Sequence, residues 1–173
     1  ALYNGAYHVF NQHYTNMVSQ KFTADSNNQW DTISAGIKQD ATDSASFARQ
    51  FNGSFEDLQK SGPYQKVLLG YKSLNNLPQF KTKMNDGRLA EYTQDFKNDM
   101  EKSWAIGKAQ RLMTEPGGSF DKAQAWAVKE FREKGRDNIF QAVDNSLMFK
   151  TEAQKDAIDG NRKNVNDILA RFT

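Results

Sequence analysis

The sequence predicts an all-α fold, an irregular bundle of about seven or eight helices without a significant sheet. Apolar side chains recur every three or four residues along most of the chain, which is the spacing of one helix face. No segment alternates apolar and polar residues over the length of a strand. The short gaps between helical patterns favour antiparallel packing around a shared core. We therefore expect a single helical domain over residues 1–173.

The first predicted helix covers residues 2–22. Its apolar side chains alternate spacings of four and three residues: Tyr3, Tyr7, Phe10, Tyr14 and Met17. We predict that the polar run at 25–28 ends this helix. A second helix should then begin near Trp30 and reach Phe51, before Gly53 stops it.

Start and stop signals divide the middle of the chain. Ser54 lies three residues before Asp57 and is placed to cap a short helix at 55–60. Pro63 suits the first turn of the next helix, because proline loses no bonded N–H there. Asn75, Asn76 and Pro78 should end that helix.

The longest helix is expected after a turn at Asp86 and Gly87, and should run to Met113. Its apolar stripe is Leu89, Tyr92, Phe96, Met100 and Trp104. The segment 114–118 interrupts the pattern, since three of its five residues are proline or glycine. It is the candidate subdomain break.

Three more helices are predicted beyond this break. Ser119 can cap the first, and Gly135 closes it. Asp137 can cap the second, which presents Ile139, Phe140, Val143 and Leu147 on one side. Thr151 and Gln154 form a capping box that should open a separate last helix. That helix carries Ile158, Val165, Ile168 and Leu169, and Gly160 is expected to weaken or break it.

Composition excludes several classes of site. The chain has no cysteine, so it can form neither a disulfide nor a thiolate site, and its compartment is left open between cytoplasm and periplasm or exterior. Mean hydropathy is -0.82, and no run approaches the roughly 20 apolar residues of a membrane span. We therefore expect a water-soluble chain without a membrane span.

Charge is spread evenly along the chain. Residues 1–86 hold 8 Lys and Arg against 7 Asp and Glu, and residues 87–173 hold 15 against 14. Nucleic-acid-binding proteins usually cluster their basic residues on one face. The densest cluster, at Lys129, Arg132, Lys134 and Arg136, is interleaved with Glu130 and Glu133, which favours helix-end stabilisation over phosphate binding. A nucleic-acid-binding module is the weakest alternative.

No residue is assigned a catalytic, cofactor-binding or metal-binding role. His8 and His13 are five apart, whereas two histidines on one helix bind a metal best at a separation of four. Ser61 lacks a nucleophile-elbow pattern, and a helix-entry role accounts for it. A helical glycan hydrolase remains an alternative, with Glu56 or Glu115 as the acids to test.

Two groups of side chains are candidates for binding. Tyr3, Tyr7, Phe10 and Tyr14 could meet a protein partner, because tyrosine combines apolar area with a polar tip. Glu91, Asp95 and Asp99 form a weaker candidate, an acidic helix face of stacked like charges. Elimination leaves a non-enzymatic structural or protein-interaction module that joins a homo- or hetero-oligomer, such as a component of a secretion, conjugation or phage assembly.

Overall fold

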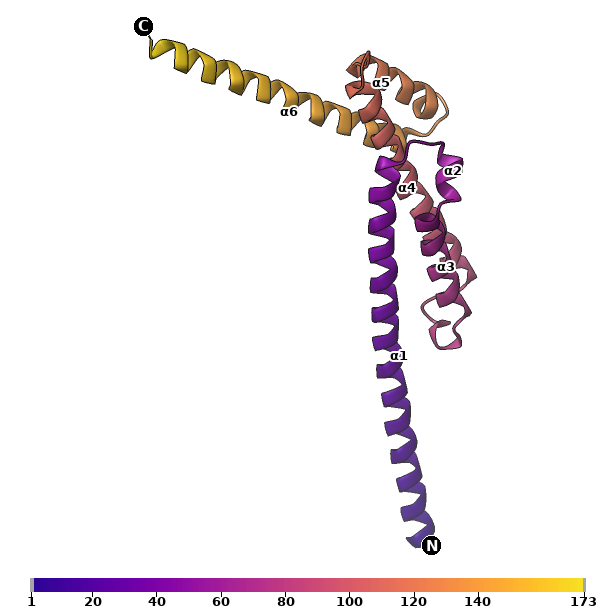
Figure 1. The fold of residues 1–173 in the computed structure, drawn as a ribbon. Helices are drawn as coiled ribbons and strands as arrows, with labels where there is room; N and C mark the ends of the chain where they lie inside the picture. Colours follow the sequence, from indigo (N-terminus) through magenta and orange to yellow (C-terminus); the bar gives the residue numbers. More distant parts are fainter. Residues whose placement is uncertain (1, 173) are drawn as a thin grey trace. The chain divides into compact units, whose positions relative to one another are not determined.

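The structure is a computed structural model that describes residues 2–172, without the side chains of 2–11, 13–14, 18–23 and 158. The fold is 85% helical, and no strand occurs among the described residues, which confirms the predicted all-α fold (Figure 1). The elements are α1 (Leu2–Gln50), α2 (Phe55–Gln59), α3 (Gly62–Asn76), a 3-10 helix (Pro78–Phe80), α4 (Asp86–Thr114), α5 (Phe120–Ala127), a π-helical turn (Val128–Arg132) and α6 (Asp137–Ala170).

Two predicted helix caps are confirmed. The backbone N–H of Asp57 donates to Ser54 Oγ at 3.1 Å, at the start of α2. The N–H of Lys122 donates to Ser119 Oγ at 3.1 Å, at the start of α5. Gly135 has a φ of +72°, which a residue with a side chain rarely adopts, and it ends the turn after α5 as expected.

The predicted break at 25–28 is wrong, because α1 is one uninterrupted helix. Aspartate, serine and asparagine each cost only about 0.7 kcal/mol or less relative to alanine inside a helix. The run contains neither proline nor glycine. Asn27 also has a partner, since Lys83 Nζ donates to its Oδ1 at 2.8 Å.

The predicted division of the last helix at Thr151 is also wrong, because α6 continues through it and through Gly160. Thr151 Oγ1 donates to the carbonyl of Leu147 at 2.8 Å, so its hydroxyl is satisfied inside the helix rather than at a cap. One glycine costs a helix only about 1 kcal/mol. Asp137 lies in the first turn of α6, and the capping position belongs to Arg136.

The predicted turn at Asp86 and Gly87 is instead the first turn of α4. The capping side chain is one residue earlier than the predicted turn. Asn85 Oδ1 accepts from the N–H of Arg88 at 2.9 Å, which satisfies one of the free donors of the first turn.

The chain divides into two compact units. The first comprises residues 1–43 and 62–94, and the second comprises residues 44–61 and 95–173. The segment 114–118 comprises the last residue of α4 and most of the turn that leads to α5, inside the second unit.

The core of the first unit is built by α1, α3 and the segment before α4. Its buried side chains are Ile37, Tyr64, Val67, Leu74, Phe80 and Met84. Gly70 lets α3 approach α1, because a Cβ at this position would come within 2.9 Å of the Ile37 side chain. Trp30 packs edge-on against Phe80, with ring centroids 5.4 Å apart.

The second unit is organised around Trp104 of α4. Its indole N–H donates to the carbonyl of Gly53 at 2.8 Å, and its ring packs edge-on against Trp126 at 6.1 Å. Arg111 donates to the carbonyls of Arg49 and Phe51 at 2.9 and 3.0 Å, so α4 satisfies free acceptors at the end of α1. The buried apolar side chains around them include Leu58, Phe96, Met100, Phe131, Ile139, Phe140, Val143 and Leu147.

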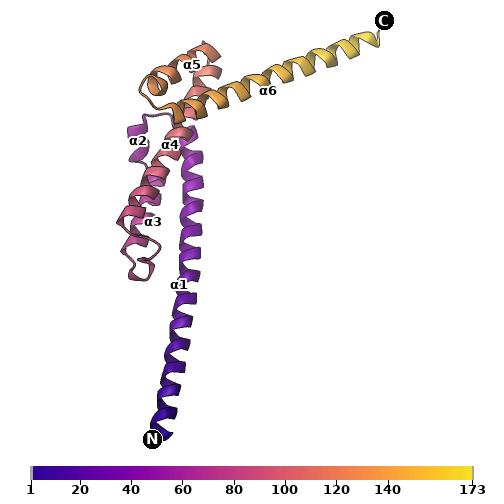
Figure 2. The same ribbon diagram turned by 180° about the vertical axis from the view of Figure 1, so that it is seen from behind.

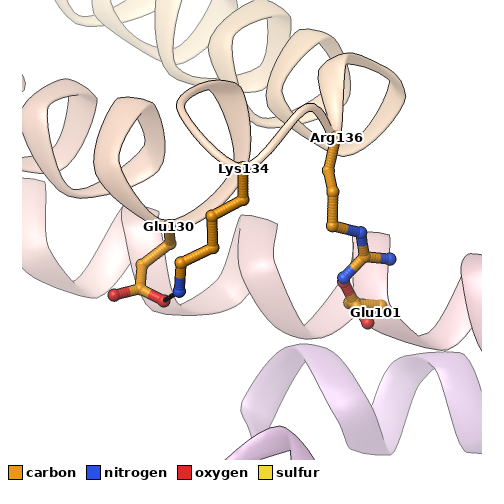
Figure 3. A network of polar contacts seen from close by, with 4 residues as sticks. All are labelled: Glu101, Glu130, Lys134 and Arg136. Carbon is orange, nitrogen blue, oxygen red and sulfur yellow. Dashed lines mark hydrogen bonds and ion pairs between the residues drawn. The ribbon is translucent and has the colours of Figure 1, made fainter.

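An ion pair joins the start of α6 to α4. The guanidinium of Arg136 contacts the carboxylate of Glu101, which is buried in α4 (Figure 3). Beside it, Lys134 Nζ lies 3.2 Å from Glu130 Oε2. Burying a carboxylate without a partner is costly, so Arg136 offsets the burial of Glu101 and links the start of α6 to α4.

Candidate functional site

The first half of α6 is packed into the second unit. Ile139, Val143 and Leu147 are fully buried. Polar side chains add two contacts: Gln110 Nε2 of α4 donates to Ser146 Oγ at 2.9 Å, and Gln124 Nε2 of α5 donates to Asp144 Oδ1 at 3.0 Å. Thr151 Oγ1 lies 3.6 Å from Met113 Sδ. Packing of α6 against its neighbours therefore reaches Thr151.

The second half of α6 has no such cover. From 152 to 172, each side chain that the structure describes is exposed. Figures 1 and 2 show the yellow part of α6 continuing past α5 with no other helix of the second unit beside it. The large apolar side chains here are exposed by more than half: Val165 54%, Ile168 52%, Leu169 59% and Phe172 83%. We call these four residues the α6 stripe.

The α6 stripe continues the face that the first half buries. Leu147 and Val165 are 18 residues apart, which is five full turns of a helix with 3.6 residues per turn, so they lie on the same side of α6. The same side of one helix is thus core before Thr151 and solvent-exposed surface after it. The four side chains of the stripe lie at spacings of three, one and three residues, which gathers them on one face.

A small cavity opens in the first unit. Its volume is about 160 Å³, which suits one apolar side chain or a small apolar molecule. Tyr71 and Tyr92 stack at its rim, with ring centroids 5.5 Å apart. The lining residues are Trp30, Ser34, Ile37, Lys38, Tyr71, Leu74, Met84 and Tyr92.

The predicted aromatic partner site lies on α1. The structure places Tyr3, Tyr7, Phe10 and Tyr14 in this helix, as the spacing predicts, but their side chains lie outside what the structure describes. The role of this face in binding a partner stays a prediction. Met17, which continues the same spacing, is described and is 55% exposed.

The predicted acidic face is exposed on α4. Glu91, Asp95 and Asp99 all lie at the surface. None of them takes part in the ion pairs found among the described residues. The like charges thus face solvent, and a cationic partner for them stays a prediction.

Most of the basic cluster is used within the molecule. Arg136 pairs with Glu101, and Lys134 pairs with Glu130. The Arg132 guanidinium lies over the ring of Phe140, 5.4 Å from its centroid. These contacts leave fewer free cations for phosphate groups.

Other candidate chemistry is dispersed. Glu56 and Glu115 are exposed, and neither lines the cavity of the first unit. The part of the chain that the structure describes contains no group of three or more acidic or histidine side chains able to hold a metal ion. The side chains of His8 and His13 lie outside that part.

The sequence placed Val165, Ile168 and Leu169 on the last predicted helix without showing whether their face is covered, and it did not single out Phe172. Periodicity shows that a helix has an apolar face, but it does not show what lies against that face. A usable signal is present nevertheless. Gln154 and Asn161 lie on the same side of the helix as Leu147 and Ile168, so amides separate the buried face from the α6 stripe where a monomer core would be apolar.

Comparisons with family models, with curated proteins and with solved structures find no match to this chain. Among the residues that the structure describes, no helix combines the length and the apolar character needed to cross a bilayer. Function is therefore inferred from the surface of the molecule itself.

Proposed function

We propose that this chain is a non-enzymatic, helical protein-interaction module that binds a protein partner through the α6 stripe. The observation that carries the proposal is the exposure of Val165, Ile168, Leu169 and Phe172 on one face of a helix beyond its packed half. Clustered exposed apolar side chains of this kind mark interaction surfaces. None of the four is a nucleophile, an acid or a base, so the surface is suited to docking rather than to a reaction.

The stability of an isolated helix supports the same proposal. Most of the stability of protein helices comes from burial of an apolar face rather than from intrinsic helix propensity. Gly160, Asn161, Asn164 and Asn166 are all weak helix formers. A partner that covers the stripe would supply the missing burial and stabilise this part of α6. Such docking suits one component of a larger assembly, the role that elimination favours.

The test is co-purification from the native source with two variants of equal charge. In the first, I168D L169D places two carboxylates in the stripe. In the second, N166D A170D places them outside it on the same helix. We expect the amount of partner recovered with the first variant to be at least about tenfold lower than with the original chain, because each new carboxylate would be desolvated at the interface. The second variant should retain the partner.

Thermal unfolding serves as the control for folding. Both variants should unfold at the same temperature as the original chain, since residues 152–172 lie outside the packed core. If I168D L169D still recovers the same proteins in the same amounts, the proposal is wrong.

A further inference from the structure

We infer that the α6 stripe binds an amphipathic helix whose own apolar face is bordered by carboxylates. This inference rests on the proposed function and adds the chemistry of the partner. It comes from the placement of charges around the stripe, which the overall charge of the chain does not reveal.

Residues 150–172 can be numbered in a seven-residue repeat, in which Thr151, Gln154 and Asn161 fall at seam positions before the α6 stripe. Val165 and Phe172 take its first position, a, and Ile168 takes its fourth, d. In packed helix pairs the positions that border this apolar seam are e and g. Here e holds Lys155, Arg162 and Leu169, and g holds Lys150, Ala157, Asn164 and Arg171.

Along residues 150–172 the positions that border the seam therefore carry four basic side chains and no carboxylate, with Arg162 and Arg171 beside the α6 stripe itself and Lys150 and Lys155 nearer the packed half of the helix. Lys155, Arg162 and Arg171 are exposed, and Lys150 is partly exposed. The four carboxylates of the same segment, Glu152, Asp156, Asp159 and Asp167, occupy the remaining positions, b, c and f. A segment with almost balanced charge thus presents only cations to whatever covers its apolar seam.

Charge at these borders selects the partner. Acidic side chains on the facing helix would pair with Lys155 and Arg162, whereas basic ones would be repelled. A second copy of this chain is disfavoured in either direction. In a parallel pair position g faces e, so Lys150 of one copy would meet Lys155 of the other. In an antiparallel pair e faces e, so the register centred on residues 155–162 would place Arg162 of one copy opposite Lys155 of the other.

A lipid surface fits the segment less well than a helix does. Residues 150–172 hold five basic and four acidic side chains, so their net charge of +1 gives little attraction to anionic headgroups. Gln154 and Asn161 lie on the apolar side. Acyl chains offer them no hydrogen bond, but a facing helix can, and a buried amide of this kind sets the register of a helix pair.

The test uses the full chain and two synthetic helical peptides of four heptads. Both peptides carry Ile at positions a, except for one Asn, and Leu at positions d. The acidic peptide has Glu at every e and g position, and the basic peptide has Lys at the same positions. Binding is followed by fluorescence anisotropy at low ionic strength. We expect the acidic peptide to bind at least about tenfold more tightly than the basic peptide, and this ratio to fall as salt is added.

Two neighbouring substitutions separate charge at the border from net charge. Arg162→Glu lies at the border of the stripe, and Lys163→Glu lies next to it in sequence on the far side of the helix. Arg162→Glu should reduce the preference for the acidic peptide at least about threefold, because it replaces attraction by repulsion. Lys163→Glu should leave the preference unchanged.

Each contrary result has a distinct meaning. Equal binding of both peptides, abolished by Ile168→Asp, would overturn the inference about charge and leave the stripe as a docking surface. If Ile168→Asp changes neither peptide binding nor co-purification, the proposed function fails as well. Tighter binding to phosphatidylserine vesicles than to the acidic peptide would overturn the inference in favour of a membrane surface. A dimer in sedimentation that Ile168→Asp dissociates would overturn it in favour of a second copy of this chain.

Discussion

The two halves of α6 share one backbone and one apolar face but have different surroundings. Before Thr151 the face is buried against α4 and α5, with Leu147 at its end. After Thr151 the same side carries Ile168 and Leu169 into solvent. An apolar face therefore shows only that a helix must be covered, and the surrounding structure shows whether the chain itself provides the cover.

The largest expected difference between the halves is in stability. Leu147→Ala should lower the free energy of unfolding by about 2–5 kcal/mol, because it removes buried methyl groups and leaves a cavity. Leu169→Ala removes the same atoms from an exposed site and should change the free energy of unfolding by about 0.5 kcal/mol or less. Urea denaturation of both variants measures the difference directly.

This pair can also contradict the account. If Leu169→Ala destabilises the isolated chain as much as Leu147→Ala does, then some part of the chain covers the stripe. The comparison between the halves would then be wrong, and so would the case for a partner.

A smaller effect is expected from Gly160→Ala. A Cβ at this position has no atom within 4 Å, so the substitution should add about 1 kcal/mol of local helix stability without a clash. Because the second half of α6 lies outside the core, the helical signal in circular dichroism should increase, while the urea concentration at the midpoint of unfolding stays unchanged. A shifted midpoint would show that this half unfolds together with the core.

Local signals in the sequence predicted the short helices well. The caps at Ser54 and Ser119 and the end at Gly135 depend on neighbours within a few residues, so the sequence contains the whole interaction. The polar run at 25–28 and Thr151 misled the prediction. Threonine, asparagine and aspartate are compatible with both a helix end and a helix interior. In the structure Asn27 accepts from Lys83 of another segment, and Thr151 donates to a carbonyl within its own helix.

The candidate site could be predicted only in part. Spacing placed Val165, Ile168 and Leu169 on one face of a helix, but it could not show that this half of α6 lies beyond its neighbours. The basic borders at Lys155 and Arg162 can be read from sequence once the seam is known to be exposed. Exposure is the observation that makes this helix face a candidate binding surface.

The most direct measurement of the central claim is site-specific photo-cross-linking in the native source. A benzophenone amino acid is placed at Ile168, in the α6 stripe, and in a matched chain at Lys163 on the far side of the helix. We predict that the probe at 168 joins the chain to a second, different protein and that the probe at 163 does not. A cross-link from 168 to another segment of its own chain, or none at all, would contradict the account.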